Sequence, residues 1–168
     1  MARRSFKSST WTPVAVADTA NFTANGYMAI QGGSATQRID IWEVFMGGQA
    51  ASAAPSIMLV SRDSTVGATL TALTTGQSDA ALDPATAALA APPASFTTAT
   101  TQPQRSATLG LLNLSFNAFG GIVRWAAPDE HGVLRILGNT ASLGELSLSA
   151  YTGGTPGLMG AHIIYEPI

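Results

Sequence analysis

The chain has 168 residues, of which 46% are hydrophobic and 11% are charged, and it carries a net charge of −2 with no cysteine. The length suits one domain with a sizeable core, and the missing cysteines exclude disulfides, thiolate metal sites and cysteine nucleophiles. An ordinary soluble domain has roughly 25% charged residues, so this surface must be rich in uncharged polar groups or largely covered by contacts.

The first ten residues are predicted to form an extended basic arm, because they hold three of the chain's 8 cations and show no apolar periodicity. A single β-sandwich domain at 11–168 is expected to follow. Two aromatic residues beside the cations would supply apolar anchors. The candidate partner-binding residues of this arm are Arg3, Arg4, Phe6, Lys7 and Trp11.

Four strands are expected in the first part of the domain, at 10–17, 26–32, 35–48 and 56–63. The first contains Pro13 and is therefore expected at a sheet edge. The strand at 35–48 has apolar residues on both faces, as a central strand does. Strict alternation would give one face Ile39, Ile41, Glu43 and Phe45, and the other face Trp42, Val44 and Met46.

Residues 64–107, called the excursion below, are dominated by Ala, Thr, Ser and Pro. Asp83 is a suitable N-cap with Pro84 at the first helical position, so one short helix is predicted at 84–90. The prolines that follow it would end the helix. An extra strand is expected at 95–100.

Strands then return at regular spacing, at 107–116, 121–127, 132–138, 144–152 and 159–167, and each separator contains turn-forming residues. This pattern predicts an all-β, antiparallel β-sandwich or jelly roll. In the segment GELSLSAYTGG, Leu146 and Leu148 alternate with Glu145, Ser147 and Ser149. The hydroxyl-bearing face is expected to meet solvent or a neighbouring subunit, since hydroxyls find partners without the cost of burying ions.

No catalytic motif is present, so we predict that the protein is not an enzyme and uses no cofactor or metal. Asp129, Glu130 and His131 could form a metal or acid–base group, but the Pro and Gly around them favour a solvated hairpin turn. His162 is expected on a solvated or interface face. Glu43 could have a raised pKa and act as a general acid.

Glu43 is more simply explained by pairing with Arg38, Arg62 or Arg124, or by exposure near the strand end. The body of the chain is slightly acidic and has no basic stripe, which argues against specific nucleic-acid binding. Its longest uncharged apolar run is much shorter than the roughly 18 residues that span a bilayer, so no membrane partner is expected.

Five features occur together: ARRSFKSS, YMAIQGGSATQRIDIWEVFMGG, LVSRDST, the Ala/Thr-rich excursion, and GGIVRWAAP followed by GELSLSAYTGGTPGLMGAHIIYEP. In style they resemble the small all-β structural proteins of tailed-bacteriophage particles, particularly the jelly-roll decoration (cement) proteins of capsids. The resemblance implies a virion protein on the capsid exterior, made in the host cytoplasm, that forms a homotrimer and binds the major capsid protein. It carries over no functional residues.

Two alternatives remain. A receptor- or carbohydrate-binding head of a phage fibre or spike would share this composition and should expose aromatic side chains for stacking on sugars. The candidates are Trp11, Trp42, Trp125, Tyr27 and Tyr151. Trp42 and Trp125 are expected in the core or an interface, because apolar neighbours flank them in their strands. The second alternative is a host-encoded soluble trimer of tumour-necrosis-factor-like shape.

Overall fold

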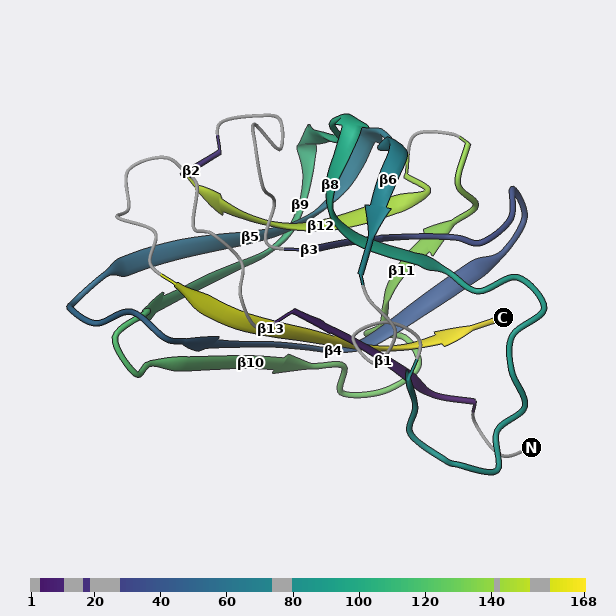
Figure 1. Cartoon of the computed structure of the whole chain (residues 1–168), viewed down its shortest axis with the longest axis horizontal. Coiled ribbons are helices and arrows are strands. Elements are labelled where there is room, and N and C mark those ends of the chain that lie inside the picture. The colour runs from purple at the N-terminus through teal and green to yellow at the C-terminus, as the bar shows by residue number, and fades with distance from the viewer. Residues whose placement is uncertain (1–3, 11–16, 19–27, 74–79, 141–142, 152–157) are drawn as a thin grey trace.

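Figure 1 shows the computed structural model of the chain, in which two antiparallel sheets pack face to face. The structure describes residues 4–10, 17–18, 28–73, 80–140, 143–151 and 158–168. Within these residues the fold is all-β, which confirms the predicted β-sandwich class. The sandwich form follows from the many short alternating segments, each of which must bury one face against another layer.

The first sheet has the order β10-β4-β13-β1-β7, and β11 continues β10 along the same edge of β4. Its strands are β1 (Phe6–Thr10), β4 (Arg38–Gly48), β7 (Ala80–Ala81), β10 (Ile122–Ala126), β11 (Leu134–Leu137) and β13 (Met159–Pro167).

The second sheet has the order β6-β8-β3-β12-β5-β9, and the two-residue β2 runs parallel to β12. Its strands are β2 (Ala17–Asp18), β3 (Met28–Gln31), β5 (Pro55–Thr65), β6 (Ala68–Ala72), β8 (Ala94–Thr101), β9 (Gln104–Asn117) and β12 (Glu145–Tyr151).

The pairing of the strands is nested along the chain, which is the connectivity of a jelly roll. The outermost pair is β1 with β13, and inside it lie β3 with β12, β4 with β10, and β5 with β9. Successive pairs alternate between the two sheets. The chain therefore forms one long series of antiparallel strand pairs that is wrapped into the two sheets of the sandwich.

The core lies between the sheets and is built from aliphatic residues, methionines and two aromatic side chains, Phe6 and Tyr165. Leu146 and Leu148 of β12 enter it, as their alternation predicted. Trp125 packs against it from β10 and is partly buried. The expected strands at 26–32, 56–63, 95–100 and in the last third of the chain are present with shifted ends.

A bulge in β4 changes which side chains of this strand enter the core. Ile164 of β13 pairs with Glu43 and Tyr165 pairs with Ile41, so Trp42 is the extra residue of the bulge. Residues on either side of a bulge keep their alternation but change face relative to each other. Ile39 and Ile41 therefore share the core with Val44 and Met46, and the predicted division of faces is wrong.

The hydroxyl-bearing face of β12 is buried, which corrects the expectation that it meets solvent or another subunit. Glu145, Ser147 and Ser149 are all buried, because β12 is an interior strand and the excursion folds over this face of the second sheet. In Figure 1 the strands β6, β8 and β9 rise above β12. Gly67 of the excursion bonds directly to the Glu145 side chain.

The prediction of an arm at 1–10 is wrong for Phe6–Thr10, which form β1 between β13 and β7. The side chain of Phe6 belongs to the core. Ser8 accepts a 2.8 Å hydrogen bond from Ser95 of the opposite sheet. The Ser8 hydroxyl can be buried in this strand because another buried hydroxyl satisfies it.

The predicted helix at 84–90 is absent from the structure. Asp83 does cap its own turn, since its side chain accepts from the Ala85 amide and its carbonyl from the Thr86 amide. Two capped amides alone do not offset the free-energy cost of nucleating a helix. The predicted strand at 10–17 lies mostly outside the described residues.

Candidate functional site: a charged pocket on the first sheet

One end of the first sheet carries a pocket of about 360 Å³ on the face turned away from the core. Strands β4, β11 and β13 and the turn between β10 and β11 contribute to it. Its lining residues are Arg38, Asp40, Trp42, Glu130, His131, Arg135, Glu166 and Ile168. Five of the chain's 8 basic and 10 acidic residues meet here. We call it the charged pocket.

The register of the first sheet assembles this pocket. Asp40 of β4 lies directly across from Arg135 of β11 and from Glu166 of β13. Arg38 and Asp40 face outward because their neighbours in β4 enter the core. Trp42, at the bulge, forms the next part of the wall. Three strands that are distant in sequence thus place their polar residues on one surface.

Asp40 accepts two hydrogen bonds from one guanidinium group and forms an ion pair with a second. Arg135 donates from Nε to Oδ1 at 2.6 Å and from Nη2 to Oδ2 at 2.9 Å, while Arg38 Nε lies 3.4 Å from Oδ1. Bidentate geometry of this kind is strong and fixes direction. The hydrogen bond to Asp40 raises the pKa of Arg135, although partial burial opposes it. Asp40 is only 4% exposed, so this carboxylate is an orienting group rather than a free base.

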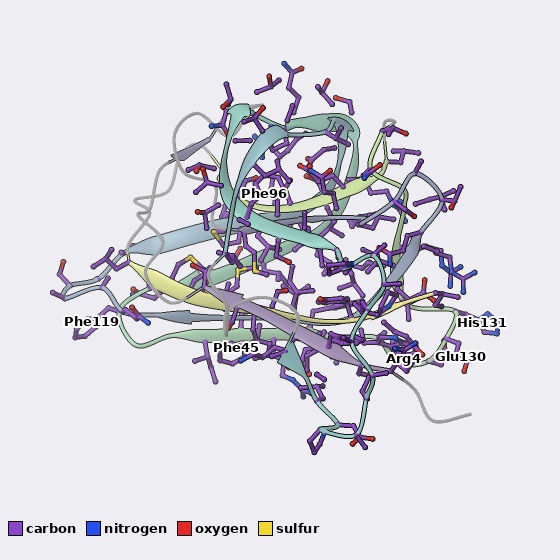
Figure 2. The ribbon with its side chains drawn as sticks, turned by 45° about the vertical axis from the view of Figure 1, so that its right-hand side comes forward. Arg4, Phe45, Phe96, Phe119, Glu130 and His131 are labelled. Atoms are coloured by element: carbon purple, nitrogen blue, oxygen red, sulfur yellow. The ribbon has the colours of Figure 1, made fainter. Side chains whose placement is uncertain are left out.

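The turn at one rim of the pocket is preorganised by Asp129. Its Oδ1 accepts from the amides of His131, at 2.8 Å, and Gly132, at 3.1 Å. Glu130 and His131 are exposed, and Figure 2 shows them at one extremity of the sandwich. The turn is solvated, as predicted, but it does not join a hairpin, because β10 and β11 both pair with β4 and not with each other in the described residues. Within the described ranges, no group of three or more His, Cys, Asp or Glu residues could hold a metal ion.

A second polar cluster lies on the same face of the sheet. Glu43 accepts a 2.5 Å hydrogen bond from Arg124 of β10 and is 3.0 Å from His162 Nε2 of β13. The His162 ring stacks on Phe45 with centroids 4.9 Å apart. The predicted pairing of Glu43 with an arginine is confirmed. Its pKa is lowered, mainly by the Arg124 hydrogen bond against an opposing effect of burial, so the expectation of a raised pKa is wrong.

The predicted partner-binding residues do not form one surface. Arg4 is exposed and donates from Nη2 to the Ala87 carbonyl at 2.8 Å, while Phe6 is buried in the core. Lys7 is half-buried on β1, between β13 and β7. Arg3 and Trp11 lie outside the described residues. Arg4 is therefore the one exposed residue among the three candidates that the structure describes.

Sequence reasoning missed Arg38, Asp40, Arg135 and Glu166. A weak signal did exist, because charges spaced two apart in a charge-poor strand must share a face. The sequence does not indicate which strands pair or in which register they pair. The pocket combines an indole, fixed guanidinium donors and carboxylate acceptors, a set that can bind a ring bearing several hydroxyl groups.

The chain matches no protein-family model, and neither a curated protein nor a solved structure matches it. Among the described residues there is no helix with the length and apolar character needed to cross a bilayer.

Proposed function

We propose that the chain is a non-enzymatic structural subunit of a bacteriophage virion, a decoration protein that binds the outside of the head as a homotrimer and stabilises it. The major capsid protein would be its partner, and the subunit would be made in the host cytoplasm before assembly. The resemblance in sequence style and the low charge support this proposal. The observation that carries it is the unprotected edge of β9.

Strand β9 is the last strand of the second sheet and pairs only with β5 among the described strands. It has 14 residues, and none of those from Ser106 to Asn117 is charged. Its regular part, Leu112–Asn117, pairs with β5 without a register shift. Monomeric proteins protect such edge strands with charged residues, prolines or short strand length, because a free edge can pair with another chain. A neighbouring subunit that covers β9 would prevent this edge from pairing with other chains.

The loops at one end of the sandwich supply a second contact surface, which we call the apolar end. It contains Phe119, Ile122 and Leu158, which are 58%, 70% and 52% exposed. Backbone bonds join these loops, since Gly48 donates to Gly121 and Gln49 donates to Leu158. Figure 2 places Phe119 at the extremity opposite Glu130 and His131. Exposed apolar groups that cluster this way are typical of interaction sites.

The decisive experiment mixes the purified protein with heads assembled from the major capsid protein encoded in the same genome. Cosedimentation and electron microscopy should show saturable binding to the outer surface and greater resistance of the heads to heat. Phe119→Ser with Ile122→Ser should weaken binding at least about tenfold, which is roughly 1.4 kcal/mol. Leu137→Ser, at an exposed apolar residue outside this cluster, is the matched control.

Absence of binding by the unaltered protein, or equal loss in the control, would contradict the decoration function. So would the absence of any capsid gene from the genome that encodes the chain. Light scattering on the same samples would report whether the bound form is a trimer.

The charged pocket favours one second candidate, a carbohydrate-binding head of a phage fibre or spike. Trp42, which was expected in the core or an interface, lines this pocket beside the oriented Arg135–Asp40 pair. A glycan array, followed by titration of the strongest glycan with fluorescence detection, tests this candidate. Trp42→Ala should abolish binding and Phe119→Ala should not. Failure of every glycan to bind would remove this candidate and leave the decoration function untouched.

A further inference from the structure

Two carboxyl groups lie together on the covered face of the second sheet, where no solvent reaches them. Asp63 of β5 and Glu145 of β12 both have 0% exposure. Their side chains interact directly with each other. Asp63 Oδ2 and Glu145 Oε1 have no other hydrogen-bond partner in the described part of the chain. Two buried carboxylates cannot both be charged at contact without a large penalty, so one must keep a proton that both share.

The remaining oxygens of this carboxyl pair are committed to specific donors. Ser147 Oγ donates to Asp63 Oδ1 at 2.8 Å. Glu145 Oε2 accepts from the amide of Gly67 at 2.9 Å and from Gln31 Nε2 at 3.1 Å. The Gln31 amide also reaches the Gly67 carbonyl at 3.3 Å. Glu145 and Gln31 together thus hold both backbone polar groups of Gly67.

Gly67 lies in the connection between β5 and β6, and this connection covers the second, smaller hydrophobic cluster. A methyl group at Gly67 would lie 3.0 Å from the Phe96 ring and 3.1 Å from Leu70, so the backbone packs directly on these side chains. Phe96 is completely buried together with Ala29. The Gly67 backbone therefore covers an apolar cluster and is itself held in place by the carboxyl pair.

The electrostatic surroundings offer little compensation for a second negative charge. Arg105, which faces Asp63 from β9, is the one cation that lowers the pKa of Asp63. Gln31, Ser61, Ser147 and the backbone at Gly67 are uncharged. Burial and the neighbouring carboxyl raise the pKa of Asp63 to about 10, and burial raises that of Glu145 to about 7. Both shifts favour the protonated form, as geometry alone requires.

We propose that Asp63 and Glu145 form a proton-dependent latch that holds Gly67 over Phe96 and opens when the shared proton is lost. In the closed state protonated Asp63 donates its proton to Glu145, the charged Glu145 is stabilised by the Gly67 and Gln31 donors, and Ser147 bonds to Asp63. Transfer of that proton to hydroxide leaves two carboxylates in contact. The repulsion is relieved when the β5–β6 connection moves away, which admits water and uncovers Phe96.

Amide hydrogen exchange of the unaltered protein, measured by NMR between pH 6 and 10 and corrected for intrinsic exchange rates, tests this latch. The equilibrium constant for opening at Gly67 should increase about tenfold per pH unit between pH 7 and 10. The reason is that opening releases one proton when the pH lies between the ordinary carboxyl pKa and the raised pKa of the closed state. The Leu143 amide, which donates to the Asp63 carbonyl, should follow Gly67. Ile163, in the core of the other sheet, reports global unfolding and should change less.

Two isosteric variants complete the experiment. In Glu145→Gln and in Asp63→Asn an amide takes the place of the shared proton as donor to the remaining carboxylate. The increase of about 100-fold in Gly67 opening between pH 7 and 9 should shrink to less than about threefold in both. Glu130→Gln, in the exposed turn, should behave as the unaltered protein does.

Three results would overturn the latch: pH-independent exchange at Gly67, an equal increase at Gly67 and Ile163, or an undiminished increase in the variants. If Glu145→Gln does not fold, Asp63→Asn and the comparison of Gly67 with Ile163 in the unaltered protein decide the question.

Discussion

Phe6 lies almost parallel to Tyr165, with the two ring centroids 6.0 Å apart and an interplanar angle of 22°. The two residues are directly paired in the register of β1 and β13. Each side chain is nearly or completely buried. The outermost strand pair of the jelly roll is therefore anchored by a ring contact inside the core, and the strand from Phe6 to Thr10 is part of the folding unit.

Replacement of Phe6 by alanine should destabilise the protein by about 3–5 kcal/mol, because it removes a large side chain from a packed core. Deletion of residues 2–9 should prevent folding, since it removes most of β1. Lys7→Gln, on the same strand, should stay within about 0.5 kcal/mol of the unaltered protein. Urea unfolding followed by tryptophan fluorescence measures all three. A folded deletion variant with unchanged midpoint would contradict this assignment of β1.

Gly48→Ala should destabilise by more than about 2 kcal/mol, since overpacking against backbone forces the chain apart. A Cβ at Gly48 would lie 2.0 Å from the Ala118 carbonyl oxygen, which is backbone that cannot move independently. Gly110→Ala is the matched control, because nothing lies within 4 Å of a Cβ there. This control should be neutral or stabilising by up to about 1 kcal/mol. Equal thermal midpoints for the two variants would contradict the close approach of the two loops.

The Glu43 cluster should stabilise the protein at neutral pH and lose its contribution in acid. The pKa of Glu43 is lowered from 4.5, so this stabilisation is complete above the ordinary carboxyl pKa and disappears as the pH falls through the lowered value. Because Arg124 is exposed, solvent screening should keep this effect small. Thermal unfolding between pH 2.5 and 6 should show a flatter slope for Glu43→Gln and for Arg124→Gln. A slope that neither variant changes would contradict the pairing.

Assembly through the β9 edge should be sensitive to one added charge. Ser115→Lys places an ammonium group at an exposed position on β9, where it should oppose strand pairing with another subunit. Multi-angle light scattering should give a trimer for the unaltered protein and smaller species for the variant. Ser52→Lys, in an exposed loop, should keep the trimer. A mass of 17.2 kDa for the unaltered protein would count against self-association through this edge.

The alternating segments made the fold class and most strands predictable, because a period of two is a local property of the chain. The orientation of β12 was not predictable in the same way. Alternation separates Leu146 and Leu148 from Ser147 and Ser149, but it does not say which face another segment will cover. Here a segment 78 residues away in sequence, at Gly67, covers the polar face. Ser147 can be buried on this face because its hydroxyl donates a hydrogen bond to Asp63.

The candidate sites depended even more on pairing that the sequence does not display. Asp40 and Arg135 are 95 residues apart, and Ser147 and Asp63 are 84 apart. Nothing near either residue identifies its partner. Glu43 was more accessible to reasoning, because a carboxylate among apolar neighbours in a chain with few cations leaves few possible partners. Arg124 was one of the three arginines considered, and it is the one that binds.

The extra residue at Trp42 makes the length of β4 more important than its composition. A substitution in this strand alters one side chain, whereas removal of one residue at the bulge would exchange the inner and outer faces on one side of it. Ile39 and Ile41 would then turn outward, while Arg38 and Asp40 would turn toward the core. We therefore expect descendants of this chain to tolerate many point changes in β4 and almost no insertions or deletions, so the count of residues there would be inherited more faithfully than their identity.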